Sequence, residues 1–77
     1  MSKTIVVHRK LGREQAEGLA YKEEKEIHID ERLKGKDYIL CAIHELLHIH
    51  EPKFSEKHVD KLSRQLTNDL WNLKIRR

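Results

Sequence analysis

The chain has 77 residues, of which 38% are hydrophobic and 38% are charged, so we expect one small domain over residues 1–77. Sixteen Lys and Arg residues against thirteen Asp and Glu residues give a net charge of +3, too small a bias to predict nucleic-acid binding by itself. No apolar run approaches the roughly 20 residues that cross a membrane, so we expect no membrane span. The single cysteine allows no internal disulfide and fits a reducing compartment, which predicts a cytoplasmic protein.

The first half of the chain predicts a small sheet. The β-branched, apolar segment Thr4–His8 is typical of a short strand. Residues 9–18 are polar and contain two glycines, which predicts a connection or a short helix. Residues 19–30 predict a hairpin, because Ile27 and Ile29 alternate with polar residues as in a strand with one buried face.

The pattern becomes helical after an expected loop at residues 33–36. Asp37 can cap a helix over residues 38–50, which contain neither Gly nor Pro, and Pro52 stops it. On a helical wheel the apolar residues gather on one broad side, so packing that side on the core would leave the other side facing a cleft. The apolar residues are Ile39, Leu40, Ile43, Leu46 and Leu47, and the other side carries Cys41, His44, Glu45 and His48.

A second helix is expected from Ser55, which can cap it, to about residue 73. Five apolar residues in this segment fall at spacings of 3, 4, 4 and 3, which is typical of an amphipathic helix with one buried stripe. These residues are Val59, Leu62, Leu66, Leu70 and Leu73.

His44, Glu45 and His48 form an HExxH sequence on the first predicted helix. Residues four apart project from the same face of a helix, so both imidazoles can bind one Zn²⁺ ion. Glu45 is placed to accept a proton from a metal-bound water without binding the metal itself. The motif therefore predicts Zn²⁺ as a cofactor and Glu45 as a general base.

A catalytic zinc site needs a third protein ligand and a fourth position that is open to water. Four candidates follow the motif closely, and the turn at Pro52 should bring them near the metal. They are Glu51, Glu56, His58 and Asp60. Glu56 and His58 flank the apolar stripe of the second helix at similar angles, so periodicity leaves both open. For Cys41 we expect a small buried thiol rather than a ligand.

Three stretches of the sequence resemble small zincin-type metallopeptidases. They are Ile27-His28-Ile29-Asp30, then Ala42 to His48, and then Pro52 with Ser55-Glu56. The similarity covers residues of about 18–73 and is greatest to the compact HExxH proteins of phages and prophages, and more distant to SprT-like and minigluzincin-like domains. The resemblance implies that His44, His48 and Glu56 bind zinc. It also implies that Glu45 is the general base.

The resemblance implies an α+β fold, a minimal zincin-like domain. A short antiparallel sheet, made of the N-terminal strand and the hairpin, would pack on the HExxH helix and on a C-terminal amphipathic helix. The implied function is a zinc-dependent metallopeptidase with a peptide or protein substrate. In this family a strand beside the active-site helix holds an extended peptide by main-chain pairing, and Ile27–Asp30 would be that strand.

The alternative is a non-catalytic, zinc-stabilised module, such as a phage regulator or a protein-binding adaptor. The sequence favours this non-catalytic module, because it contains few segments that could form the walls of a substrate cleft. A fourth protein ligand would indicate this structural role, whereas an open position would indicate the enzyme. Nucleic-acid binding is disfavoured, because the basic residues are interspersed with acids and lack stacking aromatics. The sequence contains no heptad pattern long enough to predict an oligomeric state.

Overall fold

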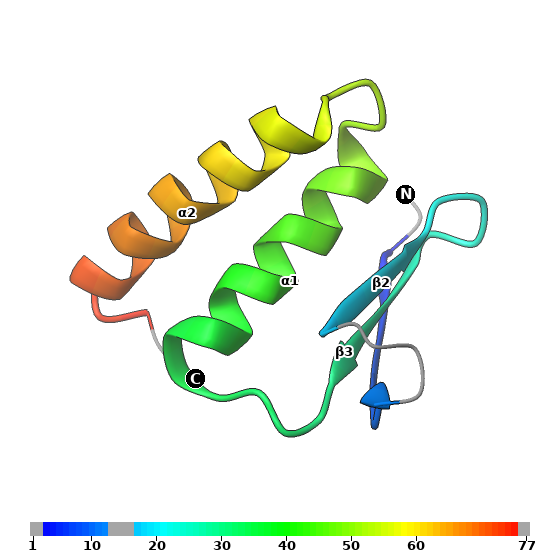
Figure 1. Cartoon of the computed structure of the whole chain (residues 1–77), viewed down its shortest axis with the longest axis horizontal. Helices are drawn as coiled ribbons and strands as arrows, with labels where there is room; N and C mark the ends of the chain where they lie inside the picture. The colour runs from blue at the N-terminus through cyan, green and yellow to red at the C-terminus, as the bar shows by residue number, and fades with distance from the viewer. Residues whose placement is uncertain (1–2, 13–16, 76–77) are drawn as a thin grey trace.

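The computed structural model describes residues 3–12 and 17–75, which form three β-strands followed by two α-helices (Figure 1). The strands are β1 (Ile5–Arg9), β2 (Gly18–Tyr21) and β3 (Glu26–Asp30), and the helices are α1 (Gly35–His50) and α2 (Glu56–Asn72). This order confirms the predicted α+β class and the predicted succession of strand, hairpin, helix, short loop and helix. The expected connection over residues 9–18 includes residues 13–16, which lie outside the described residues.

The sheet is mixed, so the prediction of an antiparallel sheet is wrong. β3 lies between the other two strands, and it pairs antiparallel with β2 and parallel with β1. The β2–β3 hairpin is confirmed. Arg9 at the end of β1 pairs with Asp30, and Gly18 at the start of β2 pairs with Ile29. The end of β1 and the start of β2 therefore lie on either side of the same end of β3, and β1 and β2 run in opposite directions.

The central position of β3 corrects the expectation that Ile27–Asp30 holds a peptide. The main-chain groups of β3 pair with β1 on one side and with β2 on the other. An added strand can pair only at the edge of a sheet, and the edges that the described residues form are β1 and β2. β2 is the edge whose first residue borders the HExxH sequence, because Gly18 and Glu45 line the same cavity.

α1 lies between the sheet and α2, which runs antiparallel to it (Figure 1). Ile27 and Ile29 of β3 pack with Cys41 and Ile49 of α1 in the hydrophobic core, as the alternation of the two isoleucines predicts. Cys41 is buried, as expected for a small thiol. The sheet therefore covers part of the side of α1 that lies opposite the apolar residues on the helical wheel, since Cys41 belongs to that side. Within the described residues, neither helix combines the length and the apolar character that a bilayer span requires.

α1 begins at Gly35, so the predicted loop at residues 33–36 is too long by two residues. Gly35 has a φ of +60°, a left-handed conformation that glycine adopts at little cost. Lys34 precedes the helix and makes no side-chain cap. Asp37 lies inside the first turn, so the prediction that it caps the helix is wrong. Its negative charge at this end of the helix remains favourable.

The loop between the helices is short, and backbone N–H groups at both of its ends form hydrogen bonds. The Glu51 N–H donates to the Leu47 carbonyl over 2.8 Å and completes the last turn of α1. Pro52 follows, and the Ser55 hydroxyl accepts a hydrogen bond of 3.1 Å from the His58 N–H. This confirms Ser55 as the cap of α2. The loop therefore returns the chain along α1 immediately after the HExxH sequence.

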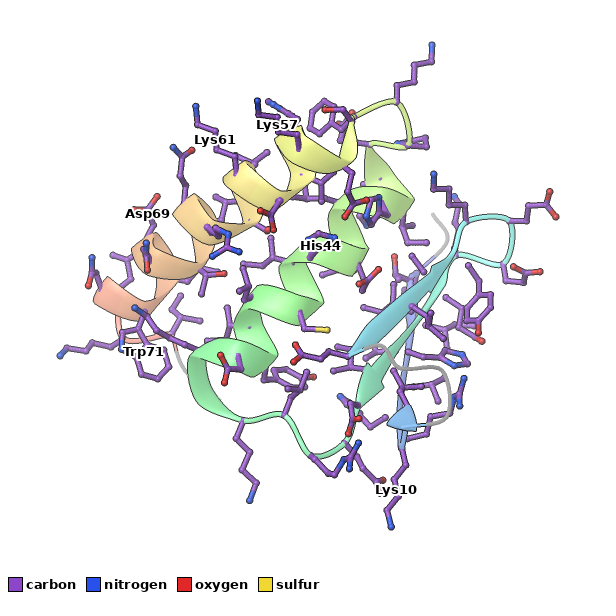
Figure 2. The ribbon with its side chains drawn as sticks, in the orientation of Figure 1. Lys10, His44, Lys57, Lys61, Asp69 and Trp71 are labelled. Atoms are coloured by element: carbon purple, nitrogen blue, oxygen red, sulfur yellow. The ribbon has the colours of Figure 1, made fainter. Side chains whose placement is uncertain are left out.

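The buried face of α2 differs from the predicted stripe. Val59, Ser63 and Thr67 are buried, whereas Leu73, a member of the stripe, is 69% exposed. The Thr67 hydroxyl donates to the Ser63 carbonyl over 2.7 Å, and the Ser63 hydroxyl donates within the same helix, so both can be buried without an unpaired polar group. These small side chains let α2 approach α1 closely. Lys57 lies on the opposite side of α2, away from α1 (Figure 2).

This difference predicts unequal effects of truncation along the stripe. We expect Val59→Ala to lower the free energy of unfolding by about 2 kcal/mol, because it removes buried methyl groups and leaves a cavity. Leu73→Ala, the matched change at an exposed position, should cost less than about 0.5 kcal/mol. Urea unfolding of both variants measures the difference. A larger cost for Leu73→Ala would show that α2 buries the leucine stripe instead.

Candidate metal centre

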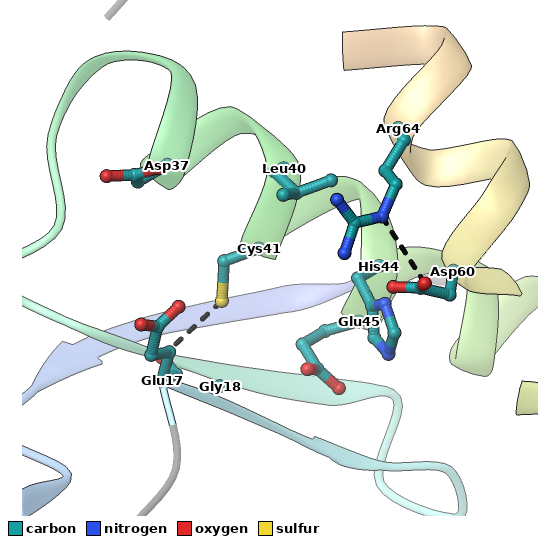
Figure 3. A pocket seen from close by; sticks show the side chains of 9 residues that line it. All are labelled: Glu17, Gly18, Asp37, Leu40, Cys41, His44, Glu45, Asp60 and Arg64. Atoms are coloured by element: carbon teal, nitrogen blue, oxygen red, sulfur yellow. Dashed lines mark hydrogen bonds and ion pairs between the residues drawn. The ribbon is translucent and has the colours of Figure 1, made fainter.

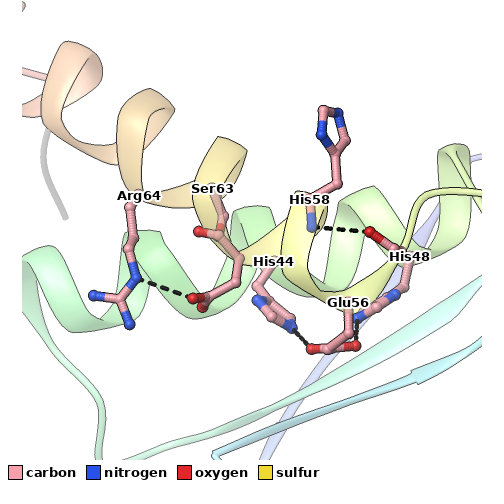
Figure 4. Close-up of polar contacts among 8 residues, drawn as sticks. His44, His48, Glu56, His58, Ser63 and Arg64 are labelled. Atoms are coloured by element: carbon pink, nitrogen blue, oxygen red, sulfur yellow. Dashed lines mark hydrogen bonds and ion pairs between the residues drawn. The ribbon is translucent and has the colours of Figure 1, made fainter.

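The two histidines of the HExxH sequence and the first residue of α2 lie together. His44 Nε2 is 2.8 Å from Glu56 Oε1, and His48 Nε2 is 3.1 Å from Glu56 Oε2 (Figure 4). The centroids of the two imidazole rings are 4.9 Å apart. One ligand atom from each of the three residues lies within 4.8 Å of the other two. The group is therefore close enough to bind a metal ion.

Secondary structure sets this geometry. His44 and His48 occupy successive turns of α1 and share one face, and the short loop places Glu56 opposite them at the start of α2. The imidazoles are 21% and 18% exposed, whereas the Glu56 side chain is 71% exposed. The two nitrogen donors thus lie on the packed helix, and the carboxylate lies on the solvent-exposed side of the group.

The donor set fits a zinc ion. Two imidazoles and one carboxylate are a ligand set found in catalytic zinc sites, with ligand distances of about 2.0–2.2 Å. Two such ligands at a tetrahedral angle lie about 3.3 Å apart. The separations in the structure, 2.8 Å from His44 to Oε1 of Glu56 and 3.1 Å from His48 to Oε2, are those of hydrogen bonds or ion pairs. Among the described residues the group contains no fourth His, Cys, Asp or Glu. Three protein ligands would leave one coordination position free.

The structure separates Glu56 from the other candidates for the third ligand. The His58 ring lies edge-on to Phe54, with ring centroids 4.5 Å apart, and it points away from Glu56 (Figure 4). The Asp60 carboxylate accepts a hydrogen bond from Arg64 Nε over 3.3 Å. Periodicity could not choose between Glu56 and His58, because the choice depends on how α2 is rotated against α1.

Two further residues that the sequence analysis considered as possible metal ligands also lie outside the group of His44, His48 and Glu56. Glu51 is exposed at the end of α1. The Cys41 Sγ donates to the Glu17 carbonyl over 3.4 Å. Burial, reinforced by the charge of Glu45, raises the pKa of the Cys41 thiol to about 12. Cys41 is therefore a protonated core residue in this structure and lacks the thiolate that binds metals.

Glu45 lies beside the group without belonging to it. It lines a cavity of about 340 Å³ together with His44 and with Gly18 at the start of β2 (Figure 3). Burial raises the pKa of the Glu45 carboxyl; His44 opposes this increase and the charge of Glu56 adds to it. A carboxyl group that holds its proton more tightly than usual is suited to both accepting and releasing a proton.

The sequence analysis did not predict that residues of α2 would line this cavity. Asp60 and Arg64 line it, four and eight residues after Glu56. That spacing places all three on one face of α2, so the signal was present in the sequence. Glu17 and Gly18 also line the cavity, but they come from the sheet, and only the tertiary fold brings them there.

The comparisons with known proteins return no match, since no family model, curated protein or solved structure is significantly similar to this chain. The resemblance to zincin-type metallopeptidases therefore remains a prediction, and the geometry of the site carries the functional argument.

The geometry predicts that Glu56 contributes more to metal binding than His58 does. We expect Glu56→Ala to weaken zinc binding by about tenfold or more, which corresponds to at least about 1.4 kcal/mol, because it removes one of three converging donors. His58→Ala is the matched control on the same turn of α2 and should bind zinc as the native chain does. Competition titration with a chromophoric chelator measures both affinities. A larger loss with His58→Ala would contradict the assignment.

Proposed function

We propose that this chain is a zinc-dependent metallopeptidase that hydrolyses peptide bonds in a peptide or protein substrate. The observation that supports the proposal most strongly is the convergence of His44, His48 and Glu56 beside a cavity that Glu45 lines. The HExxH sequence predicts His44 and His48 as ligands and Glu45 as the base, and the family resemblance adds Glu56 as the third ligand. Of the three proposed ligands, His44 lines this cavity, which could admit a substrate carbonyl.

In this proposal each residue has a separate chemical task. His44, His48 and Glu56 bind the ion, which when bound supplies Lewis-acid chemistry for the attacking water and the substrate carbonyl. Glu45 accepts the proton of the attacking water at a carboxylate oxygen and then donates it to the leaving amine nitrogen. The partial burial of Glu45 favours the protonated form and so helps the carboxyl group to carry this proton between the two steps.

The edge strand β2 is the strand best placed to bind an extended peptide. β3 is paired on both sides, whereas β2 has one unpaired edge within the described residues. β2 begins at Gly18, which borders the same cavity as His44 and Glu45. A peptide that pairs with the main chain of β2 would therefore run past the proposed catalytic centre.

A non-catalytic zinc-stabilised module is the second candidate, and the placement of the ligands favours it. His44 and His48 lie on α1, and Glu56 lies on α2, so a bound ion would fasten the two helices together. The core of this small chain is modest, and metal binding adds stability to such folds. The two functions differ in one respect, because only the enzyme requires Glu45 as a base.

The substitution Glu45→Gln separates the two functions. We expect this variant to bind zinc with native affinity, since Glu45 lies outside the ligand group. Its peptidase rate should fall by about 10²-fold or more, because the amide cannot accept the proton. Zinc content and the cleavage of a denatured protein substrate, followed by mass spectrometry, measure the two properties.

The matched control is Glu51→Gln, which removes an exposed carboxylate at the end of the same helix and should leave both properties unchanged. Cleavage that persists in Glu45→Gln would place the base elsewhere. A native chain that binds zinc and cleaves no substrate would support the structural module instead.

A further inference from the structure

Gly18, the first residue of β2, lies beside Cys41 and Glu45 of α1 (Figure 3). A Cβ atom built on Gly18 would be 2.5 Å from Cys41 Sγ, 2.9 Å from Glu45 Cγ and 3.0 Å from Glu45 Oε2. The first two separations are shorter than Cβ atoms in proteins show. A side chain at position 18 would thus occupy space that Cys41 and Glu45 now fill.

The backbone at this position is anchored on two sides. The Glu17 carbonyl accepts a hydrogen bond of 2.8 Å from the Asp30 N–H and another of 3.4 Å from Cys41 Sγ. Gly18 itself pairs with Ile29 in the sheet. β2 therefore cannot withdraw from α1 without losing contacts to both β3 and the core.

Glu45 is the neighbour that can yield most easily. Its Cγ and Oε2 atoms belong to a flexible side chain that lies against Gly18, and the charges of His44 and Glu56 also act on its carboxyl group. Cys41, in contrast, belongs to the hydrophobic core and is 7% exposed. Rotation of the Glu45 side chain would relieve the two contacts with Glu45, whereas the contact with Cys41 Sγ would require a shift of Cys41 or of β2.

We propose that the absence of a side chain at Gly18 positions the Glu45 carboxylate beside His44, which makes Gly18 a positioning residue for the reaction. This inference rests on the proposed peptidase function, in which Glu45 is the base. It assigns a role in turnover to a residue at the start of β2 that is not one of the three proposed metal ligands. Displacing a catalytic group by about 1 Å can cost on the order of 10²-fold in rate.

The first test compares Gly18→Ala with Gly12→Ala. A Cβ atom on Gly12 has its nearest contact at 3.7 Å, to Arg32 Nη2, which is an ordinary van der Waals distance. We expect Gly18→Ala to lower kcat for peptide cleavage by about 10²-fold, with KM and zinc affinity within about twofold of native. Gly12→Ala should retain native kcat. Equal kcat values in the two variants would overturn the proposal.

A double variant separates the contact with Glu45 from the contact with Cys41. Gly18→Ala with Cys41→Ala removes the sulfur atom at 2.5 Å but keeps both contacts with Glu45. We expect its kcat to stay as low as that of Gly18→Ala. Recovery of kcat in the double variant would show that Gly18 acts through the core packing of Cys41, which would overturn the proposal.

A crystal structure of zinc-loaded Gly18→Ala tests the same idea without an activity assay. The Glu45 side chain should occupy a different rotamer, while His44, His48 and Glu56 keep their places. A Glu45 carboxylate in its native position would overturn the inference. If the native chain cleaves no peptide, the proposed function fails, and this structure still decides whether Gly18 positions Glu45.

Discussion

The contact between the Glu56 carboxylate and the imidazoles of His44 and His48 is the feature on which the rest of the site depends. It exists because a short loop, closed by the Ser55 cap, returns the chain along α1 directly after the HExxH sequence. The positive end of the α2 dipole also favours a carboxylate at the first helical position. The contact therefore joins two helices and brings together three side chains that are close enough to bind a metal ion.

Local features of the sequence predicted much of this structure. The alternation around Ile27 and Ile29 gave the buried strand, Ser55 gave the start of α2, and the spacing of His44 and His48 gave two donors on one helical face. Each of these features depends on neighbours within a few residues. Local backbone geometry determines these features, and this geometry does not depend on how the elements pack together.

The features that sequence analysis missed depend on tertiary packing. The parallel pairing of β1 with β3 joins segments that are distant in the sequence, and no local pattern encodes it. The contact face of α2 was misassigned because Ser63 and Thr67 count as polar, although their hydroxyls bond within the helix and can be buried. The choice of Glu56 over His58 follows from that same rotation of α2. The role that we propose for Gly18 depends on the short separations between this residue and the side chains of Cys41 and Glu45.

The central claim is that one metal ion binds between α1 and α2, and an anomalous difference map of the zinc-loaded crystal at the zinc edge tests it most directly. The account predicts one peak per chain at about 2.0–2.2 Å from His44 Nε2, His48 Nε2 and a Glu56 oxygen, the ordinary ligand distances of zinc. A peak coordinated by His58 in place of Glu56, or no peak between the two helices, would contradict it.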